Sequence, residues 1–200
     1  MRTGLACWIA LGLIFVLTQR LVRTAFASES DAVIQLRTYD YARAGSLTIE
    51  KAQKRVSFVF NRVGINTQWV TDGQPQFRIM IIEQMDAIMT ASGEVFGYTP
   101  RDPGGTSSGM AYVAYGSIRA FVRTPQPGRP QLDLPDILGY CIAHEIGHLL
   151  LPPRSHSPTG IMRARWREDD FKLMATGRLL FTDHEVILLK NEALRLAQHH

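Results

Sequence analysis

The sequence predicts an α+β domain in which a small twisted mixed sheet packs against two helices. Three observations support this fold class. Residues 76–83 are apolar and rich in β-branched side chains, which is typical of a central strand. Residues 136–151 and 182–198 show helical apolar spacing with start and stop signals. The predicted order is therefore strand, helix, strands, helix, loop and helix.

The N-terminal part of this domain predicts one helix between two short strands. Residues 32–39 alternate well enough for a strand, and residues 66–70 predict a second one. Between them, apolar residues recur near helical spacing, with Ser46 as a candidate N-cap and Gly64 as the end. This arrangement places the helix directly before the central part of the sheet.

The middle of the chain predicts a long loop and then more sheet. Residues 93–109 contain five glycines and predict a loop with one short strand at residues 96–99. Residues 110–122 predict a strand, or two strands bent at Gly116. The proline-rich residues 124–135 then predict a connection to the next helix.

The last two helices carry recognisable end signals. For helix 136–151, Asp133 is a candidate cap, Pro135 stands near the start and Pro152-Pro153 forces the end. For the terminal helix, Thr182 and Glu185 have capping-box spacing.

The first residues have the order of a secretory leader. A positive start precedes an apolar run over residues 5–17, and Ala25-Phe26-Ala27 places small residues where signal peptidase cleaves. The apolar run is shorter than the ~20 residues that a spanning helix needs, although an uncleaved membrane anchor stays the alternative. We expect residues 1–27 to be a signal peptide and residues 28–200 to form one exported domain, secreted or periplasmic.

The mature chain is almost neutral in charge. The leader removes three of the 22 basic residues and no acidic ones, which leaves 19 basic and 18 acidic residues and a net charge of +1. We expect no nucleic-acid partner, because that needs a concentrated basic face. Cys141 is the single cysteine after the leader, and we expect it in the core and not in a disulfide.

Helix 136–151 carries the segment His144-Glu145-Ile146-Gly147-His148. Its two histidines are four residues apart, so both imidazoles project from one face of the helix. Two nitrogen ligands there can hold Zn²⁺ at about 2.0–2.1 Å. Glu145 can accept a proton from zinc-bound water and return it to a leaving amine. This is the HExxH arrangement of zinc peptidases.

A third zinc ligand has to come from another part of the chain. His156 follows the Pro152-Pro153 break, and it would complete a common three-histidine site. The alternative is Glu168, whose spacing of twenty residues after His148 resembles that of thermolysin-like (gluzincin) enzymes. The run Glu168-Asp169-Asp170 also fits a solvated acidic cluster, so we favour His156.

The stretch from His144 to Met162 resembles the metzincin zinc peptidases. Residues 159–162, Thr-Gly-Ile-Met, are similar to the Met-turn of that family, in which the methionine packs beneath the zinc-binding histidines. The spacing departs from the family pattern HExxHxxGxxH: Leu151 replaces its glycine, and His156 comes eight residues after His148 instead of six.

The resemblance implies a complete active site. It implies zinc on His144, His148 and His156, Glu145 as the general base and Met162 as the floor of the site. It also implies a twisted mixed sheet with an active-site helix and a C-terminal helix.

The sequence therefore predicts a secreted zinc-dependent endopeptidase that acts on a peptide or protein. We expect a monomer, with a membrane partner only if the leader is uncleaved. Residues 110–114 are a candidate edge strand that pairs with extended substrate. The alternative function is an exported zinc-binding module without peptidase activity.

Overall fold

The computed structural model describes residues 32–85 and 96–198 and confirms a mixed α+β fold. The expected leader, residues 1–27, lies outside the described residues. No helix in the described ranges is long and apolar enough to cross a membrane. The strands are β1 (Ala32–Asp40), β2 (Ile65–Trp69), β3 (Phe77–Ile82), β4 (Gly97–Tyr98) and β5 (Met110–Ala114). The helices are α2 (Ser46–Asn61), α3 (Tyr115–Arg123), α4 (Leu134–Leu150), α5 (Glu168–Ala175) and α6 (Asp183–Ala197).

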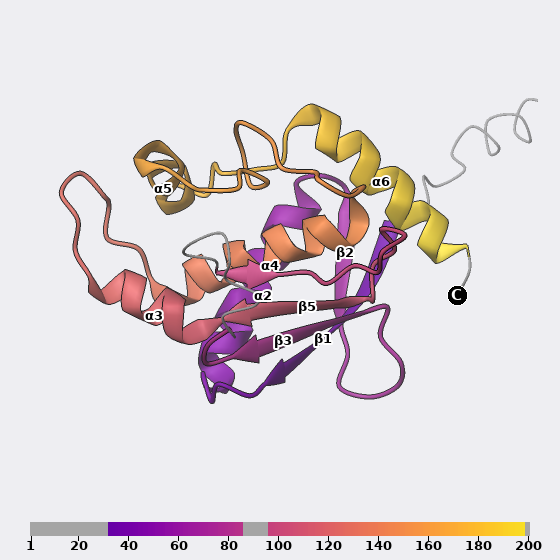
Figure 1. The fold of residues 1–200 in the computed structure, drawn as a ribbon, viewed down its shortest axis with the longest axis horizontal. Helices are drawn as coiled ribbons and strands as arrows, with labels where there is room; N and C mark the ends of the chain where they lie inside the picture. The colour runs from indigo at the N-terminus through magenta and orange to yellow at the C-terminus, as the bar shows by residue number, and fades with distance from the viewer. Residues whose placement is uncertain (1–31, 86–95, 199–200) are drawn as a thin grey trace, which may run out of the picture. The chain divides into compact units, whose positions relative to one another are not determined.

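The five strands form one mostly parallel sheet in the order β2-β1-β3-β5-β4 (Figure 1). Strands β2, β1, β3 and β5 run parallel to their neighbours, and only β4 is antiparallel, against β5. The predicted central position of residues 76–83 is confirmed, since β3 lies between β1 and β5. The expected edge position of residues 110–114 is wrong, because β4 pairs with β5 and is itself the edge strand.

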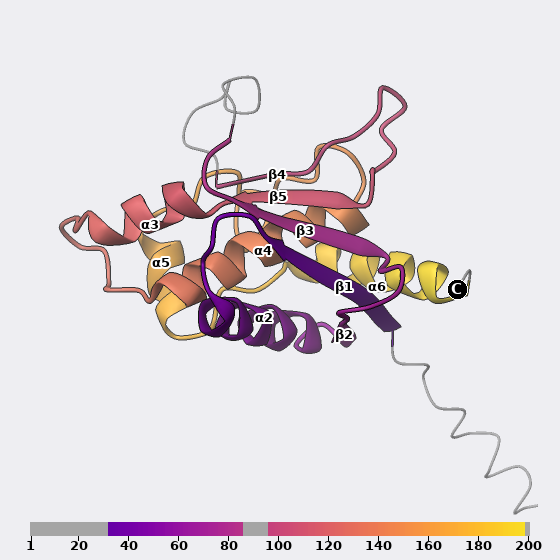
Figure 2. The same ribbon diagram turned by 90° about the horizontal axis from the view of Figure 1, so that it is seen from below.

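One face of this sheet carries the core. Alternate residues of β1 and β3, such as Ile34, Leu36, Ile79 and Ile81, are fully buried, while the residues between them are partly or fully exposed. Helices α2 and α4 pack against each other beside the sheet, and α6 contacts both β1 and α4 (Figure 2). This packing holds α4, the helix with the HExxH segment, rigidly between the sheet and its neighbouring helices.

The expectation of strand over residues 115–122 is wrong. The strand ends at Ala114, and the chain turns where the Gly116 backbone N–H donates to the Glu83 carbonyl at 2.9 Å. A Cβ at Gly116 would overlap that carbonyl, so the close approach needs glycine. Tyr115 and Ile118, three residues apart, are then buried on one face of α3. Their apolar spacing fits a helix as well as a strand.

The observed helix ends agree with the predicted start and stop signals, except at the N-termini of α4 and α2. Thr182 caps α6, and its hydroxyl and the Glu185 carboxylate form the predicted capping box. Helix α4 starts after Asp133, with a proline in its first turn, but the Asp133 side chain makes no capping hydrogen bond. Helix α2 has Gly45 at its N-cap, and Ser46 is its first helical residue.

Helix α5 was not predicted, and it changes the interpretation of the acidic run at its start. Asp170 is 4% exposed. Its Oδ2 accepts hydrogen bonds from Arg163 Nη1 and the Arg167 backbone N–H, both at 2.8 Å. This carboxylate therefore ties the segment after Met162 to the first turn of α5.

Candidate metal centre

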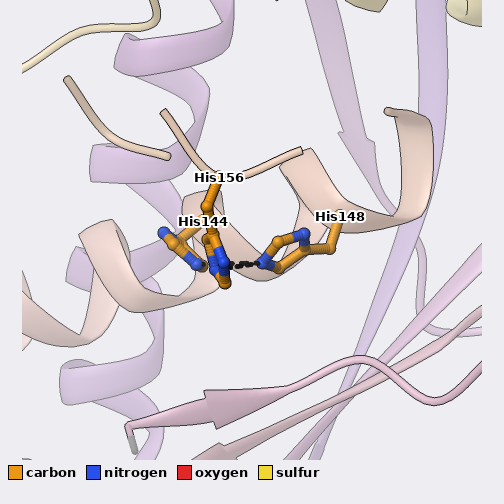
Figure 3. A group of neighbouring side chains, drawn as sticks. All are labelled: His144, His148 and His156. Atoms are coloured by element: carbon orange, nitrogen blue, oxygen red, sulfur yellow. Dashed lines mark hydrogen bonds between the residues drawn. The ribbon is translucent and has the colours of Figure 1, made fainter. Parts of the chain in front are cut away.

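Three histidines converge at the C-terminal half of α4 (Figure 3). His144 and His148 come from the helix, and His156 comes from the loop that follows it. His148 Nε2 lies 3.1 Å from both His144 Nε2 and His156 Nε2. One ligand nitrogen from each of the three residues falls within 4.8 Å of the others, and in the described parts of the chain these residues form the one such group.

Two of the rings are oriented by partners at their other nitrogen. His144 Nδ1 lies 2.7 Å from the Ile161 carbonyl oxygen, which can only accept, so Nδ1 carries the hydrogen and Nε2 presents its lone pair. His148 Nδ1 lies 3.2 Å from Ser155 Oγ. Such partners at Nδ1 are the usual way in which a protein directs a histidine Nε2 toward a metal.

The electrostatics of the cluster favour neutral imidazoles. Burial lowers the pKa of His144 to about 4, although the Ile161 carbonyl opposes this change. Burial, and then the charges of His144 and His156, lower the pKa of His148 to about 3. His156 is exposed as a residue, and partial desolvation of its ring lowers its pKa as well. All three rings are therefore neutral at pH 7, which is the form that ligates a metal.

The spacing of the nitrogens fits a tetrahedral metal ion. Ligands at about 2.0–2.1 Å in a tetrahedron lie roughly 3.3–3.4 Å apart, close to the observed 3.1 Å separations. Converging lone pairs on neutral rings repel each other unless a cation lies between them. The neutral rings and two of the three nitrogen separations therefore fit a tetrahedral metal ion such as Zn²⁺.

Glu145 is buried under the edge strand. It is 4% exposed, and its Oε2 accepts a 2.7 Å hydrogen bond from the Thr99 hydroxyl. A Cβ on Gly97 would overlap the Glu145 carboxylate, so β4 lies directly against it. Burial raises the pKa of Glu145 to about 8, partly offset by Thr99. In the metal-free protein this carboxyl therefore carries its proton at pH 7, and a cation held by the histidines would favour its ionised form.

Met162 packs against α4 at Gly147. It is fully buried, and a Cβ on Gly147 would overlap its sulfur. The thioether therefore packs on the backbone of α4 between the two helical histidines, and the glycine of His144-Glu145-Ile146-Gly147-His148 is required by this contact.

The remaining candidates lie apart from the metal centre. Glu168 is exposed and pairs with Lys172 at 2.7 Å, and it is not part of the histidine group. Cys141 is a buried free cysteine, as expected. His184 is exposed on α6.

Sequence reasoning did not find the residues that orient this centre. No sequence motif includes the contacting residues Thr99, Gly97 and Ser155. Only the position of Ser155 next to His156 could have suggested a role for it. Trp166 donates from Nε1 to the Ile161 carbonyl at 3.0 Å, and its ring meets the His144 ring edge-on at 5.9 Å. One carbonyl thus holds both a ligand and its aromatic neighbour.

Comparisons with known proteins add little to this geometry. No family model and no curated protein matches the chain. The solved structure of myroilysin is similar with a TM-score of 0.34 and 14% sequence identity, over 78% of this chain and 71% of that one. A TM-score this low decides neither fold family nor function.

Proposed function

We propose that the protein is a metzincin-like zinc-dependent endopeptidase that acts outside the cytoplasm. The observation that carries the proposal is the convergence of the ring nitrogens of three histidines. The buried carboxyl of Glu145 follows His144 directly in the sequence. The signal peptide predicted for residues 1–27 and the resemblance of residues 144–162 to the metzincins support the proposal.

The residues of the chain divide the chemistry between them. His144, His148 and His156 would hold Zn²⁺, which when bound supplies a Lewis acid and lowers the pKa of its water toward ~7. Glu145 accepts the proton from the attacking water and returns it to the leaving amine. Thr99 and Gly97 keep the carboxyl in place. Among the described strands β4 is the edge strand next to β5, and its outer edge would pair with an extended peptide, the role that the sequence assigns to residues 110–114.

The same centre argues against a purely structural zinc site. Structural zinc is usually bound by four protein ligands, whereas the ligand group found in residues 32–85 and 96–198 has three. A structural site also gains nothing from a carboxyl that is costly to bury. The fourth coordination position would be left to water and substrate.

The decisive comparison is between the zinc-loaded chain and its Glu145→Gln variant on a mixed peptide library. We expect the variant to keep one zinc per chain and to lose about 10²–10⁴-fold in turnover, because only the proton acceptor is removed. Full turnover in the variant would overturn Glu145 as the base. Zinc retention without any cleavage by the unaltered chain would favour the zinc-binding module.

A further inference from the structure

The third histidine stands on a segment without regular secondary structure. The loop from Leu151 to Met162 contains neither helix nor strand, and His156 itself is exposed. Burial of the ring therefore does not explain how this imidazole stays within 3.1 Å of His148. The contacts of the residues beside His156 have to hold it there.

The residue after His156 makes contacts through both its side chain and its backbone. The Ser157 hydroxyl donates to Glu185 Oε1 at 2.6 Å, and the Ser157 backbone N–H donates to the Met162 carbonyl at 3.0 Å. The hydroxyl also lies 2.8 Å from the Thr159 carbonyl oxygen, but the carboxylate is the stronger acceptor for its single proton. The first bond reaches across 28 residues to the first turn of α6. The second closes the loop onto Met162. The side chain and the backbone N–H of Ser157, the residue directly after His156, are thus both held by hydrogen bonds.

Glu185 divides its two oxygens between two tasks. Oε2 accepts from the Thr182 backbone N–H at 2.7 Å, which completes the capping box of α6. Oε1 has no part in the capping box and accepts from Ser157 instead. The carboxylate is only 4% exposed, and a buried carboxylate is retained at a cost unless each oxygen has a donor. Capping alone therefore does not account for the whole environment of Glu185.

A second contact joins the loop of residues 151–162 to the chain just before α6. The Ile161 backbone N–H donates to the Leu180 carbonyl at 3.1 Å. Gly160 adopts φ +77° and lies so close to that carbonyl that a Cβ would stand 2.7 Å from it. The loop that carries His156 is therefore laid against residues 180–185 at two points.

We propose that Glu185, acting through Ser157, is a positioning residue for the third metal ligand. It does not touch the metal or the substrate. Its buried carboxylate transmits the rigid position of the α6 N-terminus to His156, which no helix supports. The inference rests on the proposed metal site but not on peptidase activity.

Two matched variants separate this role from ordinary capping. Ser157→Ala removes the loop contact and leaves the capping box of α6 intact. Thr182→Ala removes the cap hydroxyl and leaves the Ser157–Glu185 bond intact. Each variant of the full chain is measured for zinc dissociation constant by chelator competition, for the absorption spectrum of its Co²⁺ form, and for the thermal midpoint of its metal-free form.

We expect Ser157→Ala to weaken zinc binding about 10–100-fold, the usual effect of losing a partner behind a metal ligand. Its Co²⁺ spectrum should change, while its metal-free midpoint moves less than that of Thr182→Ala. Thr182→Ala should lower the midpoint and leave the zinc dissociation constant within about twofold of the unaltered chain. Glu185→Gln, whose amide has a single acceptor oxygen for the two donors, should both raise the zinc dissociation constant and lower the midpoint.

Two results would overturn the proposal. Zinc affinity unchanged in Ser157→Ala would show that His156 needs no anchor at Glu185. Equal losses of zinc affinity in Ser157→Ala and Thr182→Ala would assign the effect to α6 stability. If the unaltered chain held no zinc, the metal site itself would fail, and that outcome is recognised before any variant is compared.

Discussion

The two histidines of α4 and the histidine of the following loop reach the same point by different means. His144 and His148 are brought together by the repeat of one helix, whose hydrogen bonds join residues four apart. His156 depends on contacts that cross long stretches of sequence, above all the bond from Ser157 to Glu185. The helical pair is therefore set by local geometry, and the loop ligand is set by tertiary structure.

The comparison predicts the same loss of metal but different losses of stability when a histidine is removed from either region. His144→Ala and His156→Ala should each weaken zinc binding roughly a thousandfold or more, because two ligands replace three. In the metal-free protein His156→Ala should change the free energy of unfolding by less than about 0.5 kcal/mol, since the ring is exposed.

The helical histidine should behave differently in the same measurement. His144→Ala removes a ring packed against Trp166 and leaves the Ile161 carbonyl with one donor fewer, so we expect a loss of about 1–3 kcal/mol. Denaturant unfolding in a chelator, beside zinc titration of each variant, tests both regions. Stoichiometric zinc retained by His156→Ala would contradict its assignment as the third ligand.

A second difference between the regions is the buried charge on the helix side. The pKa of Glu145 is about 8 in the folded protein against an ordinary value of 4.5, so the unfolded chain releases this proton at lower pH. The metal-free fold should therefore lose stability as pH rises from about 4.5 to about 8. Glu145→Gln removes this titration and keeps an oxygen that can accept from Thr99.

The variant should consequently be the more stable protein at high pH. We expect the two free energies of unfolding to be similar near pH 4.5 and to differ by a few kcal/mol above pH 8. Because the histidines titrate in both proteins, their contribution cancels in the difference. Unfolding curves in a chelator from pH 4.5 to 9 provide the measurement, and a difference that did not grow with pH would contradict the buried, protonated state of Glu145.

The same contrast between local and tertiary determinants decides what the sequence could predict. Helix α4, its proline-determined end and the capping box of α6 are properties of neighbouring residues, and each was confirmed. Helix α3 was mistaken for strand because the approach of Gly116 to Glu83, which turns the chain, is a tertiary contact. The site shows the same division.

The HExxH motif predicts His144 and His148, and the histidine after the proline break suggests His156. No sequence pattern predicts the residues that orient these rings. Asp170 shows the reason for this difference. Its position in an acidic run favours a solvated side chain, and only the folded chain places Arg163 beside it. A buried carboxylate is recognisable from sequence only when its partner is close enough to form a pattern.

The last prediction concerns the contact between α4 and the loop that carries His156. A Cβ at Gly147 would overlap the Met162 sulfur, so Gly147→Ala should cost about 1–3 kcal/mol through overpacking. Gly104→Ala is the matched control, because Gly104 is exposed and its added Cβ would lie 3.3 Å from the nearest atom, Asp102 Oδ1.

A double-mutant cycle with Met162→Ala shows whether the helix and the loop are coupled at this point. If the cost of Gly147→Ala comes from the thioether, it should fall sharply in the Met162→Ala background, where the sulfur is gone. A cost that stayed the same in both backgrounds would locate the strain elsewhere, for example at Phe181, whose ring lies 3.2 Å from the same Cβ position. The coupling energy thus measures directly how firmly the Met162 turn is tied to the helix that carries His144 and His148.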